Sequence, residues 1–170
     1  MVSTPEPYKF LGETLGFWIQ TGALIISAIA AIIIIAANRR DNKRRAIIDL
    51  VIQQKQDPEL QEAKRLVLSM HDDKASNAAH HLTDRNSPEY KAILRVLNQY
   101  EFIAAGIKES ALDEEIFKRV QYSVCVKDWE LLSGFVMEFR RQSARNTLFQ
   151  EFEHLAKRWK KKPLEKYTEV

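Results

Sequence analysis

The amino-acid sequence predicts an all-α protein, in which one hydrophobic helix near the N-terminus is followed by a bundle of four to five amphipathic helices. Ala, Leu, Ile, Glu, Lys, Arg and Gln dominate the 170 residues, and these residue types favour helix. Five glycines and five prolines are too few for the many turns of a β protein. The mean hydropathy is −0.34, although one stretch is almost purely apolar. Hydrophobicity is therefore concentrated in one segment of a largely polar chain.

The apolar segment covers residues 17–37, FWIQTGALIISAIAAIIIIAA, and contains no charged residue. As a helix of 1.5 Å rise per residue it spans roughly 30 Å, the thickness of a hydrocarbon core. A buried helix of a soluble protein and a signal peptide are the alternatives. A signal peptide begins with basic residues, whereas residues 1–16 carry two glutamates and one lysine. We expect a transmembrane helix over 17–37, with residues 1–16 as a short tail outside the cytoplasm.

Positive charge is distributed unequally on the two sides of this segment. One lysine precedes it, and five basic residues follow within eight positions: Arg39, Arg40, Lys43, Arg44 and Arg45. Because basic residues favour the cytoplasmic side, we expect the N-terminus outside and the rest of the chain in the cytoplasm. The same cluster predicts contact with anionic membrane lipids.

Small residues recur at every fourth position of the segment, at Ala23, Ser27 and Ala31. This spacing lets two helices approach closely in lipid and predicts a homo-oligomer. A monomeric anchor is the alternative, because the pattern also arises by chance. The segment lacks the ionisable residues that mark an ion path, although a pore-forming effector is retained as an alternative function.

Helix signals continue after the basic cluster. Renewed apolar spacing predicts a stalk helix over residues 38–56. Asp57-Pro58 predicts the start of the next helix, with Asp as its N-cap and Pro in its first turn. The other elements are expected as follows: that helix ending near His71, a short turn around Ala78 to Leu82, a helix from Pro88 to about Ile107, a helix capped by Asp113 that bends near Lys127-Asp128, and a last helix from about Arg145 to Lys161. The cytoplasmic domain is expected over 57–162 and a tail over 163–170.

One segment of the expected bundle has a distinctive sequence. It reads NQYEFIAAGI over residues 98–107 and is followed by Asp113-Glu114. Together with the apolar segment and the sequence RRDNKRR after it, this segment resembles a family of small bacterial and prophage-encoded membrane proteins described as a domain of unknown function. The resemblance runs from about Trp18 to Phe139. It implies that the protein is located in the bacterial inner membrane. It also implies a role in host defence or in exclusion of competing phage, with a phage or host protein as a partner.

A polar motif lies within that segment. Asn98 and Glu101 are three residues apart and share a helix face, and Asp113 follows as a cap. A glutamate in a mostly apolar helix needs a partner if it is buried. We interpret the pair as a structural tie to a neighbouring helix, through Arg119 or a backbone group. A ligand-binding or catalytic carboxylate is the alternative.

Three weaker patterns bear on chemistry. His71, His80 and His81 offer nitrogen ligands for a transition metal, but their spacing matches no established motif, and a solvated loop is favoured. The spacing of Arg65 and His71 is that of a residue pair in some dimeric helical ribonucleases, so a membrane-tethered ribonuclease is an alternative function.

No cofactor motif is present. The last helix is basic, and contact with anionic lipid or solvent is favoured over nucleic acid.

The single cysteine, Cys125, cannot form a disulfide within the chain. It lies in an apolar helical stretch, so we interpret it as a small buried hydrophobic residue. The favoured function is a membrane-anchored, self-associating interaction module without enzymatic activity.

Overall fold

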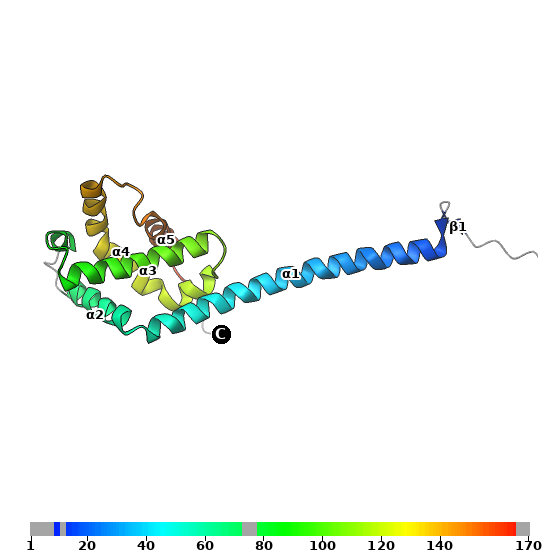
Figure 1. The fold of residues 1–170 in the computed structure, drawn as a ribbon, viewed down its shortest axis with the longest axis horizontal. Helices are drawn as coiled ribbons and strands as arrows, with labels where there is room; N and C mark the ends of the chain where they lie inside the picture. Colours follow the sequence, from blue (N-terminus) through cyan, green and yellow to red (C-terminus); the bar gives the residue numbers. More distant parts are fainter. Residues whose placement is uncertain (1–8, 11–12, 73–77, 166–170) are drawn as a thin grey trace, which may run out of the picture. The chain divides into compact units, whose positions relative to one another are not determined.

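A computed structural model describes residues 9–10, 13–72 and 78–165 of the chain, and it confirms the all-α fold class (Figure 1). The helices of the described residues are α1 (Leu15–Gln56), α2 (Pro58–Asp72), the 3-10 helix η1 (Ala78–Leu82), α3 (Pro88–Lys108), α4 (Glu114–Ser143) and α5 (Gln150–Lys161). Two strands of two residues each, β1 (Lys9–Phe10) and β2 (Glu13–Thr14), pair antiparallel just before α1. The sequence pattern did not predict these strands.

The chain divides into two compact units, residues 1–42 and residues 43–170, and the boundary falls within the unbroken helix α1. In the first unit the apolar part of α1 has no protein around it, and its most hydrophobic window is 0% buried. In the second unit the last turns of α1 carry buried residues, Ile47 and Gln54. The expected stalk is thus the same helix as the apolar segment, and it ends at Gln56.

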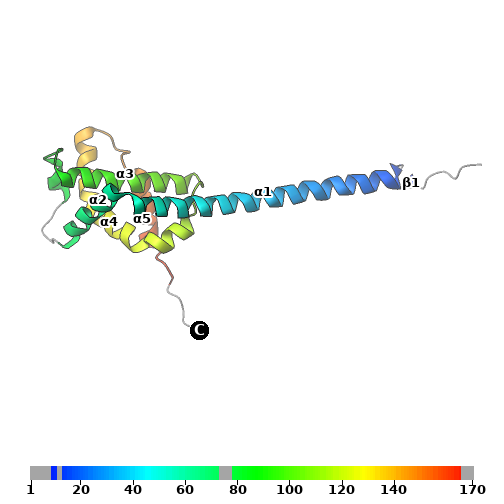
Figure 2. The same cartoon turned by 60° about the horizontal axis from the view of Figure 1, so that its bottom comes forward.

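The second unit is a helical bundle around one hydrophobic core. α2 packs along α3, α3 packs along α5, and η1 lies against α4. Figures 1 and 2 also show the end of α1 beside the first half of α4. The largest fully buried side chains are Trp159, Phe117, Phe135, Phe152, Ile47, Ile93, Leu97, Ile103 and Leu132. Every helix of the bundle contributes an apolar stripe to this core.

Three helices begin where the sequence predicts, because the expected side chains cap them. The carboxylate of Asp57 accepts the amide of Leu60 at 3.0 Å at the start of α2. The hydroxyl of Ser87 accepts the amide of Tyr90 at 3.1 Å at the start of α3. Asp113 caps α4 in the same way, as described below. Each cap satisfies an amide that has no partner within its own helix.

The last helix begins later than predicted, at Gln150 instead of near Arg145. Ala144 and Phe149 both adopt left-handed backbone conformations, with φ of 53° and 56°, and these interrupt the helical path. The guanidinium Nε of Arg140 donates to the carbonyl of Leu148 at 2.8 Å and holds the intervening turn. α4 itself is one unbroken helix across Lys127-Asp128, and both views show that it changes direction along its length.

Candidate functional site

The junction of α3 and α5 is built around the carboxylate of Glu101. Phe149, the N-cap residue of α5, provides no side-chain hydrogen bond to its own helix. Instead Glu101 accepts the amide of Glu151 at 3.2 Å and the amide of Phe152 at 2.8 Å. A carboxylate at this end of a helix also interacts favourably with the helix dipole. Glu101 therefore caps a helix that lies 50 residues further along the chain.

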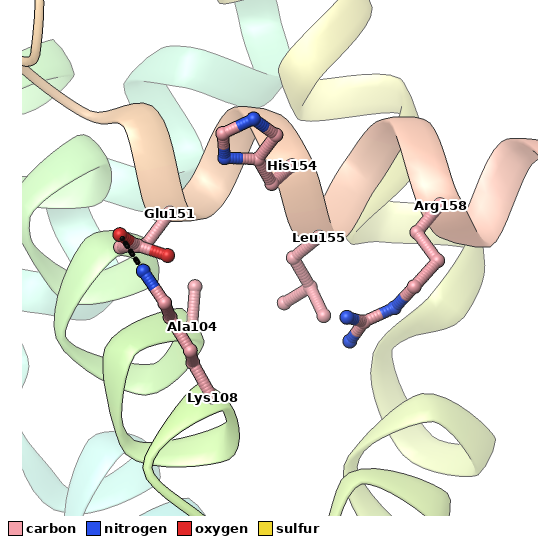
Figure 3. Close-up of a pocket in the computed structure, with 6 residues that line it drawn as sticks. All are labelled: Ala104, Lys108, Glu151, His154, Leu155 and Arg158. Carbon is pink, nitrogen blue, oxygen red and sulfur yellow. Dashed lines mark hydrogen bonds and ion pairs between the residues drawn. The ribbon is translucent and has the colours of Figure 1, made fainter.

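A small pocket of about 280 Å³ lies beside this junction, between α3 and α5 (Figure 3). Lys108 and Glu151 point toward one another across its edge, with Nζ and Oε1 2.7 Å apart. Arg158 also lines it and binds Glu114 at 2.8 Å. Both cations lining the pocket thus already have carboxylate partners. Its remaining lining residues are Ala104, His154 and Leu155.

A second polar cluster includes residues of α1, α2, α3 and α4, and the charge of Asp128 acts on Lys64. Tyr100 donates its hydroxyl to Oδ2 of Asp128 at 2.8 Å, and the two residues are 3% and 6% exposed. Lys64 donates to Oε1 of Gln54 at 3.3 Å. Gln61 donates to the backbone carbonyl of Gln54 at 2.7 Å. The two bonds to Gln54 join the last turn of α1 to α2, and the bond from Tyr100 to Asp128 joins α3 to α4.

The electrostatics of this cluster favour a structural role. Burial, followed by the charge of Asp128, raises the pKa of Tyr100 well above its ordinary value. Burial likewise raises the pKa of the Cys125 thiol. Burial lowers the pKa of Lys64, and the nearby Asp128 opposes that shift. The phenol and the thiol therefore keep their protons at neutral pH, and neither is an activated nucleophile.

Of the candidate ribonuclease pair, the structure describes the side chain of Arg65 alone. Arg65 lies on the surface of α2, where its side chain is 78% exposed and binds Glu62 at 3.3 Å. The side chain of His71 lies outside the described residues.

The candidate metal ligands fall around η1. His80 is exposed and His81 half-buried, and both belong to that short helix. Across the described ranges, which omit 73–77, no group of three or more His, Cys, Asp or Glu residues is placed to hold a metal ion. The nearby Asp84 accepts the amide of Asn86 at 2.9 Å, which is a turn contact.

The polar motif of the sequence divides into different roles. Asn98 is exposed on α3, whereas Glu101 caps α5. Asp113 accepts the amide of Ile116 at 3.1 Å and lies 3.6 Å from Nε of Arg44. The partner of Glu101 is thus a pair of backbone groups. Asp113 is thus both the cap of α4 and an ion-pair partner of Arg44 in α1.

The two basic clusters also differ. In α5, Lys157, Arg158 and Lys160 all bind glutamates of the same domain. In α1, Arg44 binds Asp113. The other basic residues that follow the apolar segment have no partner among the described residues: Arg39, Arg40, Lys43 and Arg45. Four basic residues without a partner among the described residues thus follow the apolar segment, where contact with anionic lipid was expected.

Sequence reasoning missed Tyr100, Asp128 and Gln54. A signal was present for Asp128, which interrupts the apolar stripe of α4 between Cys125 and Leu132. A charged residue in the buried phase of a helix indicates a partner within the core. No local signal identifies the partner as Tyr100, because the two residues are 28 positions apart.

The fold defines a class of protein: an all-α domain preceded in the chain by a helix that is long and apolar enough to cross a membrane. A family model described as a domain of unknown function (DUF4760) matches residues 19–159. The chain belongs to this family, and the resemblance found in the sequence is confirmed to that extent. No curated protein and no solved structure matches the chain.

Proposed function

We propose that this protein is a membrane-anchored helical interaction module. In this proposal residues 17–37 cross the membrane, and the bundle binds protein partners, including further copies of itself, in the cytoplasm. The observation that carries the proposal is the exposure of the apolar part of α1. Ile25, Ile29 and Ile33 are 55%, 53% and 62% exposed, although each is as apolar as a core residue. Such a surface is stable in lipid and costly in water.

Two alternative roles for the apolar helix are less well supported. A core helix of a soluble protein buries its apolar side chains, whereas the most hydrophobic window here is 0% buried. A signal sequence is removed from the mature protein. Here α1 continues without a break to Gln56, and the family match begins at residue 19, so the apolar segment is part of the shared domain.

The orientation follows from the free basic residues. Arg39, Arg40, Lys43 and Arg45 directly follow the span, and the residues before it carry one lysine. By the positive-inside rule the bundle is cytoplasmic, and these four side chains contact the anionic inner leaflet. Phe17 and Trp18, whose rings pack edge to face, would lie at the outer interface.

The polar groups that the bundle places together have structural roles. Glu101, Asp113 and Tyr100 are all engaged in contacts that hold helices together. Small residues at Ala23, Ser27 and Ala31 support self-association within the membrane. The resemblance to prophage-encoded membrane proteins extends the proposal to host defence or exclusion of competing phage, in which the partner is a phage or host protein.

The anchor is tested by placing two charges in the span of the full-length chain, as Ile29→Asp with Ile33→Asp. Each aspartate costs about 2.5–3.5 kcal/mol near the bilayer centre. We expect the double variant to leave the carbonate-resistant membrane fraction. The matched control is Leu68→Asp with Phe102→Asp, at exposed apolar positions of the bundle, 63% and 65% exposed. The control stays in the membrane.

The same preparation tests the orientation. A reporter fused to the C-terminus of the full chain should be protected from protease in intact spheroplasts and cleaved after lysis. Wild-type protein in the soluble fraction would overturn the anchor. Cleavage of the reporter from outside intact spheroplasts would overturn the cytoplasmic placement of the bundle.

A further inference from the structure

The part of α1 that belongs to the second unit, residues 43–56, is attached to the bundle at three places. Near its start, Arg44 forms an ion pair with Asp113. Further along, Ile47 is 0% exposed and belongs to the hydrophobic core. In the last turn, Gln54 accepts hydrogen bonds from two side chains of α2. We call residues 43–56 the α1 strap.

The attachment at the start of the strap is incompletely satisfied. Nε of Arg44 lies 3.6 Å from Oδ2 of Asp113, which is too long for a hydrogen bond. This nitrogen is buried and has no hydrogen-bond acceptor among the described residues. The other carboxylate oxygen of Asp113 accepts the amide of Ile116 as the cap of α4. A buried donor without an acceptor has lost its hydrogen bonds with water and gained none in the protein, so it disfavours the docked strap.

The attachment at the end of the strap has the same defect. Gln54 is 6% exposed, and its Oε1 accepts Nζ of Lys64 at 3.3 Å. Its Nε2 is buried and has no acceptor in the part of the chain that the structure describes. Burial also lowers the pKa of Lys64, and the charge of Asp128 opposes that shift. Both groups lie at the contact between the strap and α2, and both regain water when that contact opens.

The two defects of the strap are not typical of the rest of the bundle. Within the described ranges, one more buried side-chain nitrogen lacks a hydrogen-bond partner, Nη2 of Arg140. That side chain is fixed by two other bonds, from Nε to the carbonyl of Leu148 and from Nη1 to Glu153. Of these three nitrogens of the described residues, α1 thus carries two, one at each polar attachment of the strap.

The apolar attachment of the strap is small. Ile47 is its fully buried apolar side chain, and Leu50 and Val51 are partly buried against the core. By contrast, α3 buries nine residues, among them Ile93 and Leu97 at 0% exposure. Segments with few buried apolar contacts open at a lower free energy than the core does. The strap is therefore held more weakly than the helices that it covers.

We propose that the α1 strap is a releasable cover of the bundle core. In the closed state Ile47 lies in the core. In the open state the strap leaves the other helices while it remains helical, its unsatisfied donors bind water, and the apolar surface beneath Ile47 becomes accessible. The strap thus keeps that surface closed to protein partners until it is released. The opening requires neither the anchor nor self-association, so its test is independent of the proposed function.

Thiol labelling of the full-length protein in detergent measures the opening. In a Cys125→Ala background, Ile47→Cys should be labelled at least about tenfold faster than Leu97→Cys, a fully buried position of α3. The labelling rate of Ile47→Cys should also depend little on urea, since opening exposes much less surface than unfolding does. Equal rates with the same urea dependence would show that the strap opens only when the bundle unfolds, and would overturn the inference.

A second substitution separates strap opening from the packing that Ile47→Cys itself removes. Gln54→Met with Lys64→Met replaces the imperfect polar attachment by apolar side chains of similar length, and should slow the labelling of Ile47→Cys at least about threefold. Gln53→Met with Lys55→Met, at exposed positions of the strap, is the matched control and should leave the rate unchanged. Circular dichroism confirms that each variant is folded. Unchanged or faster labelling after the first pair of substitutions would contradict the proposal.

Discussion

Isoleucine occupies two opposite environments in this protein. In the apolar part of α1, Ile25, Ile29 and Ile33 are more than half exposed, whereas in the bundle Ile93 and Ile103 are 0% and 1% exposed. The bundle stabilises its isoleucines by packing them against other protein side chains. The most hydrophobic window of α1 is 0% buried, and in the proposed function lipid takes the place of such packing. The same residue type is thus buried in the core of the bundle and exposed on the apolar part of α1.

The largest expected effect is a loss of stability of the bundle, and it should distinguish a buried isoleucine from one in the apolar part of α1. Ile93→Ala removes a fully buried side chain and should destabilise the bundle by about 2–5 kcal/mol, because a cavity replaces packed atoms. Ile29→Ala should leave the unfolding of the bundle unchanged. Urea unfolding in detergent, followed by the fluorescence of the buried Trp129 and Trp159 in a Trp18→Phe background, measures both. A comparable loss from Ile29→Ala would mean that the span packs on the bundle.

A smaller effect is expected within the bundle, at the cap between α3 and α5. Glu101→Gln removes the charge that accepts two backbone amides, and should cost about 1 kcal/mol of stability. Hydrogen exchange should quicken most at the amides of Glu151 and Phe152. Asn98→Ala, at an exposed position one turn earlier on α3, is the control and should change neither quantity. Equal effects from the two substitutions would show that the capping contact contributes nothing.

The smallest effect is a pH dependence at the start of α2. The amide of Leu60 and the guanidinium of Arg95 hold the pKa of Asp57 below its ordinary value of 3.8. A carboxyl whose pKa is lower in the native state stabilises that state above its unfolded pKa, and the contribution is lost as the pH falls through the native value. Asp57→Asn should therefore lower the unfolding midpoint at pH 7, and the difference from wild type should shrink below about pH 3.8. A difference that is constant with pH would exclude this linkage.

Much of the fold could be predicted because its signals are local. Asp57, Ser87 and Asp113 stand where caps belong, and α2, α3 and α4 begin directly after them. The start of α5 could not be predicted in this way. Its cap comes from Glu101, a residue distant in the chain, and the preceding Phe149 takes a left-handed conformation that its own side chain does not favour.

The sequence by itself determined the all-α class, the apolar segment and the cap positions, because composition, periodicity and capping act over a few residues. Only the tertiary structure decided the roles of the polar residues. Glu101, Tyr100 and Asp128 meet their partners across 28 to 51 positions of chain, and those distances are closed by helix packing.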